Sequence, residues 1–328
     1  MHKLIENQVR ISVRNLVEFI LRSGDIDNRH STKAQYDAMQ IGSRLHRKIQ
    51  GSMPGTYKAE VSLKHTAHYR DVEILLEGRA DGIITPDEKS VREEQANLFY
   101  QAKIDENVSA EISFIIDEIK VIRQDMEKLD SAAQVHIAQA LCYAYMYAKV
   151  LNTKAGVTEE NTRLCIGIQI TYCHPETEEI KRFLKVYTFK EIKEEFDHYI
   201  SEYGKWAQFL YEHRLERNAS VQKLSFPYPY RAGQKRLVAA AYRTMINGEQ
   251  LFIQAPTGIG KTLSTVFPAV WAVGEEYADK IFYLTAKTIT RTAAVSAFDI
   301  LRENGLKMSY IALTSKEKIC PNTVMECN

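Results

Sequence analysis

The feature that most constrains the fold of this chain is a glycine-containing loop at positions 253 to 262, which reads IQAPTGIGKT. Its apolar start predicts a strand and the residues after it predict a helix, so the loop belongs to an α/β domain. Gly258 and Gly260 let the backbone N–H groups of the loop turn towards an anion. Lys261 can then meet the β- and γ-phosphates, and Thr262 can offer its hydroxyl to Mg²⁺. The pattern predicts a nucleoside triphosphate site, and the alternative is a glycine-rich turn that binds nothing.

Composition places the chain among soluble proteins. Its 328 residues are enough for two domains that each bury a core. No segment approaches the ~20 apolar residues of a membrane span, and residues 1 to 7 lack the apolar core of a signal peptide, so we expect a cytoplasmic protein with no membrane partner. Five cysteines, an odd number, argue against a disulfide framework. The net charge of +1 restricts any contact with DNA to local basic surfaces.

Two α/β regions are expected to meet near residues 218 to 220, because the prolines that follow interrupt a long helical pattern. In the first region we predict helices at 8–22, 33–50, 131–151 (with Ser131 as N-cap) and 189–216, strands at 57–64, 72–85, 112–122, 164–173 and 180–188, and a surface excursion at 86–107. The apolar stripe of the last helix, Phe189 to Leu210, is expected to be core. In the second region helix 233–246, strand 251–255, helix 261–275 and strand 280–285 alternate as in a parallel sheet.

Two carboxylates and a lysine stand out in the first region. Glu118 and Lys120 are two residues apart in an apolar strand, so they lie on the same face, and Asp117 faces the opposite way. Burying such charges costs several kcal/mol unless they pair or hold a metal. Asp81, in an earlier strand, can converge on the same point. Such a set suits hydrolysis of a phosphodiester, since Mg²⁺ takes oxygen ligands and activates water while the lysine meets the developing charge.

The order Asp81, Glu118, Lys120 resembles the signature of PD-(D/E)xK nucleases. His46, and Gln139 followed one helical turn later by Tyr143, resemble the RecB-like subset of that family. The resemblance implies a nuclease α/β domain that uses Mg²⁺ or Mn²⁺. The roles it implies are metal binding by His46, Asp81 and Glu118, action on water by Lys120, and a DNA-facing position for Gln139 and Tyr143.

Each of these residues also has a plain interpretation. Glu118 and Lys120 could form a surface ion pair, Asp81 and Gly82 could form a hairpin turn, and His46 could be a solvated helix residue. Gln139 and Tyr143 could be ordinary positions of an amphipathic helix. Their order on the expected elements favours the nuclease fold over these separate readings. The cysteines that hold an iron–sulfur cluster in some RecB-like nucleases have no counterpart, and we expect core thiols at Cys142, Cys165 and Cys173.

The phosphate loop, with Ala255 where the general form has glycine, resembles motif I of superfamily 2 helicases. Upstream, Arg231 and Gln234 resemble the element with which those helicases contact adenine, and residues 281 to 288 resemble their DNA-contacting motif Ia. The resemblance implies that ATP is bound by Arg231, Gln234, Thr257, Gly258, Gly260, Lys261 and Thr262. Gln234 could otherwise be a plain surface residue.

Near the end of the sequence, Cys320 to Cys327 resembles the opening of the iron–sulfur insertion in the XPD and DinG branch of these helicases. A 4Fe–4S cluster takes four thiolates, of which Cys320 and Cys327 would supply two. The alternative is a pair of unrelated cysteines.

Taken together, the chain resembles the amino-terminal part of a bacterial XPD/DinG-like helicase with a RecB-like nuclease domain at 1–218 and an incomplete, RecA-like helicase ATP-binding domain at 222–328. The resemblance implies cleavage of single-stranded or end-bearing DNA, coupled in a longer protein to ATP-driven unwinding in DNA repair. After Lys261 no acidic motif that would hold Mg²⁺ is found, so this chain alone is not expected to unwind DNA. The rival hypotheses are a catalytically silent nuclease fold that clamps DNA, and an ATPase whose first region binds protein.

Overall fold

A computed structural model describes residues 3–23, 32–53, 55–85, 112–256, 258–286 and 288–321. The chain divides into two compact units, and the division falls between Gln208 and Phe209. This point lies inside one long helix, α5 (Phe189–Gln222), which continues six residues past the predicted end at residue 216. The predicted surface excursion at 86–107 lies outside the described residues. The two units are described separately below.

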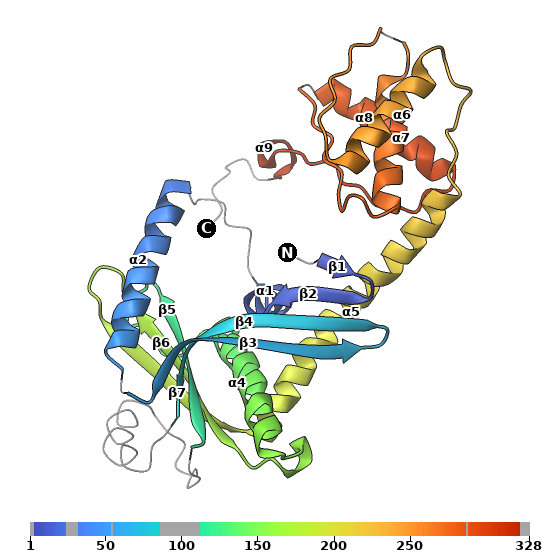
Figure 1. The fold of residues 1–328 in the computed structure, drawn as a ribbon. Helices are drawn as coiled ribbons and strands as arrows, with labels where there is room; N and C mark the ends of the chain where they lie inside the picture. The colour runs from blue at the N-terminus through green and yellow to red at the C-terminus, as the bar shows by residue number, and fades with distance from the viewer. Residues whose placement is uncertain are drawn as a thin grey trace. The chain divides into compact units, whose positions relative to one another are not determined.

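Unit 1 is built on a mixed sheet of seven strands, in agreement with the expected α/β class (Figure 1). The strand order is β1-β2-β4-β5-β6-β7, and β3 pairs with β4 beside this path. Only β2 with β4 and β5 with β6 run parallel among the described pairs. The strands are β1 (Lys3–Ile5), β2 (Gln8–Ser12), β3 (Tyr57–Tyr69), β4 (Val72–Ile84), β5 (Phe114–Val121), β6 (Cys165–Cys173) and β7 (Ile180–Thr188).

The remaining elements of unit 1 are helices that pack on this sheet (Figure 1). They are α1 (Val13–Ile20), α2 (Thr32–Gly51), α4 (Gln134–Ala155), a short 3₁₀ helix (Glu159–Asn161) and α5. The predictions for β3 to β7 and for the bodies of α2, α4 and α5 are confirmed.

The prediction of a helix from residue 8 is wrong, because residues 8 to 12 form β2. Val9 and Ile11 are buried while Arg10 between them is exposed, which is the alternation of a strand with one buried face. The helix begins only at Val13, where the hydroxyl of Ser12 accepts a hydrogen bond from the backbone N–H of Asn15. The alternating pattern covers only five residues and continues directly into a helix. It was therefore too short to distinguish the strand from the helix in the sequence.

Helix α4 packs on β5 and β6 and also contacts α5. Its middle turns are buried almost all round, and the Tyr145 ring stacks on Phe196 of α5 with centroids 4.0 Å apart. The predicted cap at Ser131 is wrong: the N-cap is Ala133, which has no side-chain hydrogen bond. The apolar stripe of α5 is buried from Phe189 as far as Tyr203, but Trp206 and Phe209 are 37% and 49% exposed, so the stripe is core only in its first half.

Unit 2 contains the end of α5 with α6 (Gln234–Asn247), α7 (Lys261–Gly274), α8 (Thr288–Glu303) and α9 (Lys316–Ile319). The helices predicted at 233–246 and 261–275 are confirmed, and their apolar residues form one core that includes Val238, Leu263 and Val270. None of the described helices of the chain is long and apolar enough to cross a bilayer.

The strands predicted at 251–255 and 280–285 are not formed: neither segment has regular secondary structure. A strand requires a neighbour for its backbone N–H and C=O groups, and no described residue pairs with these segments. The apolar side chains that were predicted to lie in a sheet are therefore exposed to solvent: Phe252 is 93% exposed and Leu284 is 88% exposed. Ile311 is 81% exposed in a third segment.

Candidate functional site

Glu118 and Lys120 form a buried ion pair on β5. The Lys120 Nζ lies 2.7 Å from Glu118 Oε1, as expected for residues two apart on one strand face. The Glu118 side chain is 2% exposed and that of Lys120 is 23% exposed. The interpretation of this pair as a surface ion pair is therefore wrong.

Asp81 and His46 lie beside this pair. Asp81 is a residue of β4, so the hairpin-turn interpretation is wrong, and its Oδ2 accepts a hydrogen bond of 2.9 Å from the backbone N–H of Ile119. The Nδ1 of His46 lies 3.6 Å from Asp81 Oδ1. His46 is held there because its neighbours on α2, Leu45 and Ile49, pack on Ile119 in a small apolar cluster.

Helix α4 adds Gln139 and Tyr143 to the site. Lys120 Nζ donates to Gln139 Oε1 at 3.2 Å, and Gln139 in turn hydrogen bonds to the Tyr143 hydroxyl. Gly78 makes room for Tyr143, because a Cβ at that position would lie 2.6 Å from the Tyr143 ring. Gln139 and Tyr143 are only 7% and 3% exposed, so they support Lys120 from within the core and offer little surface to a DNA strand. The structure thus brings all six predicted residues of the first region together.

The electrostatics of the site centre on Glu118. Its Oε2 is buried and has no hydrogen-bond partner among the described residues. Burial raises the pKa of Glu118 to about 8, against the effect of Lys120 and with a further increase from Asp81. A buried carboxylate oxygen without a hydrogen-bond partner lowers the free energy of unfolding. Binding of a cation or a hydrogen-bond donor at this atom would therefore be favourable.

A divalent cation fits the donor set of this site by its chemistry, since two carboxylates and an imidazole are ordinary ligands of Mg²⁺ or Mn²⁺. Among the described residues, no three His, Cys, Asp or Glu side chains are already arranged to hold a metal ion. The reason is visible in the contacts: Lys120 occupies one oxygen of Glu118, and Asp81 is bound to Ile119 and near His46. A metal ion would meet Glu118 at Oε2, which no donor of the described residues occupies.

The sequence analysis missed a buried network on the other side of β5. Asp117 is fully buried and accepts hydrogen bonds from Thr171 Oγ1 (2.5 Å), Gln169 Nε2 (3.0 Å) and the Tyr57 hydroxyl (3.2 Å). Strand alternation correctly turned Asp117 away from Glu118, but its partners come from distant segments. The network ties β5 to β6 and thereby fixes the strand that carries Glu118.

His136 is a second residue that the sequence analysis missed. Its Nδ1 lies 2.8 Å from the Tyr172 hydroxyl, and burial, then the charge of Lys120, lower the pKa of His136 to about 4. The signal that could have found it is its position three residues before Gln139, on the same side of the helix.

In unit 2 the phosphate loop has the conformation that its glycines predict. Gly258 and Gly260 have φ of 86° and 80°, in the left-handed region where a Cβ is strained. Gly260 is the N-cap of α7 and offers no side chain to the N–H groups of the first turn, which suits an anion. Lys261 folds back over the loop and donates to the carbonyl oxygens of Ala255 (2.8 Å) and Pro256 (3.2 Å).

Arg231 and Gln234 lie against this loop. Gln234 is 4% exposed, so its interpretation as a surface residue is wrong. Its Nε2 donates to Ser264 Oγ at 3.1 Å and its Oε1 accepts from the backbone N–H of Arg231 at 3.0 Å, while the Arg231 guanidinium donates to the carbonyl of Gly258. The Gln234 amide thus contacts α7 at one end and the backbone of Arg231 at the other, and Arg231 in turn contacts the loop.

Several predicted residues give less information. Thr262 is the second residue of α7, whereas Thr257 and Cys327 lie outside the described residues. Cys320 is a free, half-buried thiol. Cys142 and Cys173 are buried as expected of core thiols, and Cys165 is half-buried.

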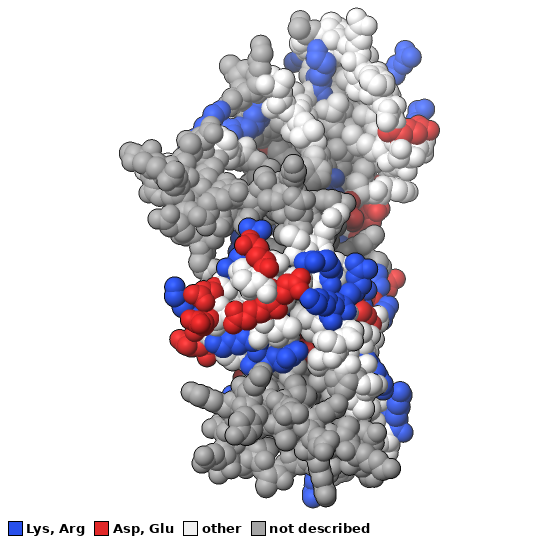
Figure 2. Space-filling model, turned by 90° about the vertical axis from the view of Figure 1, so that its left-hand side faces the viewer, with Lys and Arg blue, Asp and Glu red and all other residues white. Residues whose placement is uncertain are grey.

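The face drawn in Figure 2 shows no broad basic surface among the described residues. On the face drawn in Figure 2, basic and acidic side chains of the described residues are interleaved. Arg44 and Lys48, beside His46 on α2, are both paired with Glu178. Any attraction of DNA to this face would therefore be local.

Comparison with known proteins gives one partial relationship. No protein-family model matches the chain. Over 90 residues it is 33% identical to the probable ATP-dependent helicase MJ0942 of Methanocaldococcus jannaschii, a match that covers 27% of this chain and 13% of the relative. Among solved structures, the crystal structure of SSO0001 has 17% identity and a TM-score of 0.33, covering 61% of this chain and 77% of that one. The chain is thus similar to a probable ATP-dependent helicase over about a quarter of its length.

Proposed function

We propose that unit 1 is a metal-dependent DNA nuclease and that unit 2 is the nucleotide-binding part of a helicase. The observation that carries the first half is the buried Oε2 of Glu118, which has no hydrogen-bond partner in the described part of the chain and lies beside Asp81, His46 and Lys120. Burying this carboxylate without a hydrogen-bond partner lowers the stability of the fold. A catalytic metal site would explain why the fold nevertheless keeps it there.

In this proposal His46, Asp81 and Glu118 would hold Mg²⁺ or Mn²⁺, and the ion would supply charge neutralisation and an activated water for phosphodiester hydrolysis. Lys120 orients the attacking water and stabilises the charge that develops on the phosphate oxygens. Gln139 fixes the position of the Lys120 ammonium through their 3.2 Å contact. Tyr143 in turn fixes Gln139.

The proposal for unit 2 is supported by the two left-handed glycines, the uncapped start of α7 and the contact of Gln234 with the loop. The name of the partial relative points the same way. ATP phosphates would bind at the N-terminus of α7, with Lys261 moving from the loop carbonyls to the phosphates. For a longer protein we propose two further features. One is coupling of the nuclease to DNA unwinding in repair, and the other is a 4Fe–4S cluster with Cys320 and Cys327 as two of its ligands.

The main alternative is a silent nuclease fold that clamps DNA. Cleavage of labelled single-stranded and end-bearing DNA with Mg²⁺, Mn²⁺ or EDTA separates the two. The nuclease proposal expects metal-dependent products from the wild type and none from Glu118→Gln, which keeps the side-chain shape but removes the charge. Should the wild type and Glu118→Gln prove equally inert and bind DNA equally, the clamp is the better account.

A further inference from the structure

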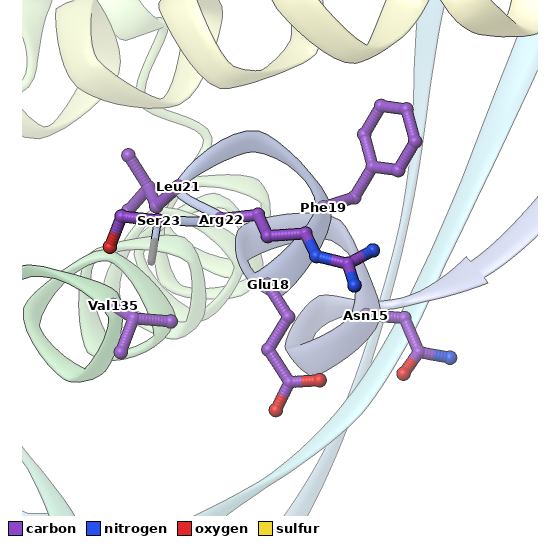
Figure 3. A pocket seen from close by; sticks show the side chains of 7 residues that line it. All are labelled: Asn15, Glu18, Phe19, Leu21, Arg22, Ser23 and Val135. Atoms are coloured by element: carbon purple, nitrogen blue, oxygen red, sulfur yellow. The ribbon is translucent and has the colours of Figure 1, made fainter. Parts of the chain in front are cut away.

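A groove of about 520 Å³ lies between the end of α1 and the first turn of α4. Its volume is within the range of about 300–1,000 Å³ that is usual for small-ligand sites. Figure 3 shows Asn15, Phe19 and Arg22 of the α1 side together, with Val135 of α4 across the groove from them. None of these residues was singled out from the sequence.

The groove adjoins the candidate nuclease site along α4. Val135 is four residues before Gln139, which places it about 6 Å further along the helix, on the same side. Gln139 is the residue that holds Lys120. Between them, His136 lies close enough to Lys120 and to Arg14 of α1 for both charges to act on it. Val135, on the α4 side of the groove, is therefore one helical turn from Gln139, which contacts Lys120.

An aromatic ring forms one wall of the groove. Phe19 is 43% exposed, and it is held by an edge-to-face contact with Tyr203 (5.7 Å between centroids) and by Trp206 (6.0 Å). A partly exposed ring that is fixed from behind is a platform for stacking, and nucleic-acid bases stack on such rings irrespective of sequence.

The groove is lined by one acidic and one basic side chain, Glu18 and Arg22. Glu18 pairs with Arg14 at 2.6 Å, whereas no ion pair of Arg22 is found among the described residues, so Arg22 is the cation that could meet a phosphate there. A guanidinium beside an aromatic ring suits a nucleotide, since the first binds phosphate and the second a base.

We propose that this groove is a subsite for single-stranded DNA, which holds the nucleotide next to the scissile phosphate with its base on Phe19 and its phosphate at Arg22. This inference rests on the proposed nuclease function of unit 1. It assigns the DNA contact to α1 rather than to the buried Gln139 and Tyr143.

The test uses the full chain with Phe19→Leu, Arg22→Gln and, as a matched loss of one exposed cation at the far end of α4, Lys154→Gln. Fluorescence anisotropy in EDTA measures binding of a labelled single strand, and cleavage is measured with Mg²⁺. Phe19→Leu is expected to weaken binding by about fivefold to a hundredfold, the range for loss of one base–aromatic stack. Arg22→Gln is expected to lower the slope of log K against log salt by about one, and Lys154→Gln to leave it unchanged. Trp206 fluorescence checks that Phe19→Leu is folded.

Strands with one abasic position then locate the stacked base. In the wild type a single abasic position next to the cleaved bond should cost the same factor as Phe19→Leu, and it should cost nothing further in that variant. If the wild type cleaves DNA while Phe19→Leu and Arg22→Gln bind and cleave normally, the subsite is overturned and the nuclease function stands. If those variants lose binding but no metal supports cleavage, the groove is a DNA site and the nuclease function falls. Absence of any DNA binding overturns both.

Discussion

Gly82→Ala should destabilise unit 1, because Gly82 lies under the Tyr57 ring. A Cβ at this position would be 1.9 Å from the Tyr57 hydroxyl oxygen and 2.0 Å from Cζ, so the ring must move. Overpacking of this kind costs about 1–3 kcal/mol. Displacement of Tyr57 also removes its 3.2 Å hydrogen bond to buried Asp117, at about 1–2 kcal/mol. Alanine also lowers the entropy of the unfolded chain, which offsets about 0.5–1 kcal/mol, so the expected loss in the free energy of unfolding is about 1–4.5 kcal/mol.

Urea unfolding followed by tryptophan fluorescence measures this loss in unit 1 alone. The chain has two tryptophans, so Trp271→Phe leaves Trp206 as the reporter of unit 1. Gly42→Ala is the control, because nothing lies within 4 Å of a Cβ there and alanine is the better helix former. On a Tyr57→Ala background Gly82→Ala should cost almost nothing. Equal stability of Gly82→Ala and wild type, or the same cost on both backgrounds, would refute the reasoning.

Three further predictions concern the two sites. In EDTA the free energy of unfolding of the wild type should fall as pH rises from 4.5 towards 8, because the raised pKa of Glu118 keeps a proton on the folded state that unfolding releases. At pH 7 this loss is roughly 3 kcal/mol. Urea titrations at pH 5, 7 and 9 measure it, and Glu118→Gln should remove it. Gly78→Ala should displace Tyr143 and lower single-turnover cleavage at least about tenfold, with metal affinity kept. Lys261→Ala should abolish binding of a fluorescent ATP analogue, and Gln234→Ala should weaken it about tenfold by releasing the loop.

Local patterns in the sequence predicted much of unit 1. Strand alternation placed Glu118 and Lys120 on one face and Asp117 on the other, because the direction of a strand side chain depends only on its parity. The approach of Asp81 to Ile119, 38 residues away, depends on pairing that no local pattern contains. The sequence analysis could therefore say only that Asp81 can converge on Glu118, and the position of His46 was expected from the family resemblance alone.

The predictions that were wrong or incomplete also depended on contacts between distant segments. Strands at 251–255 and 280–285 were predicted from apolar composition, but a strand forms only where a neighbour satisfies its backbone. The donors of Asp117 come from β6 and from Tyr57 at the start of β3, so its network was not readable from the sequence around it. Helical spacing correctly put Gln139 and Tyr143 on one side, but it gave no sign that this side is buried.

Binding of Mn²⁺ to nucleotide-free protein, followed by electron paramagnetic resonance of the free ion, tests the central claim most directly. The account predicts one site per chain in the wild type and in Lys261→Ala, loss of that site in Glu118→Gln and Asp81→Asn, and its retention in Lys120→Ala, where one more oxygen of Glu118 becomes available. Mn²⁺ binding that is absent from the wild type, or that is equally strong in Glu118→Gln, would contradict a metal site in unit 1.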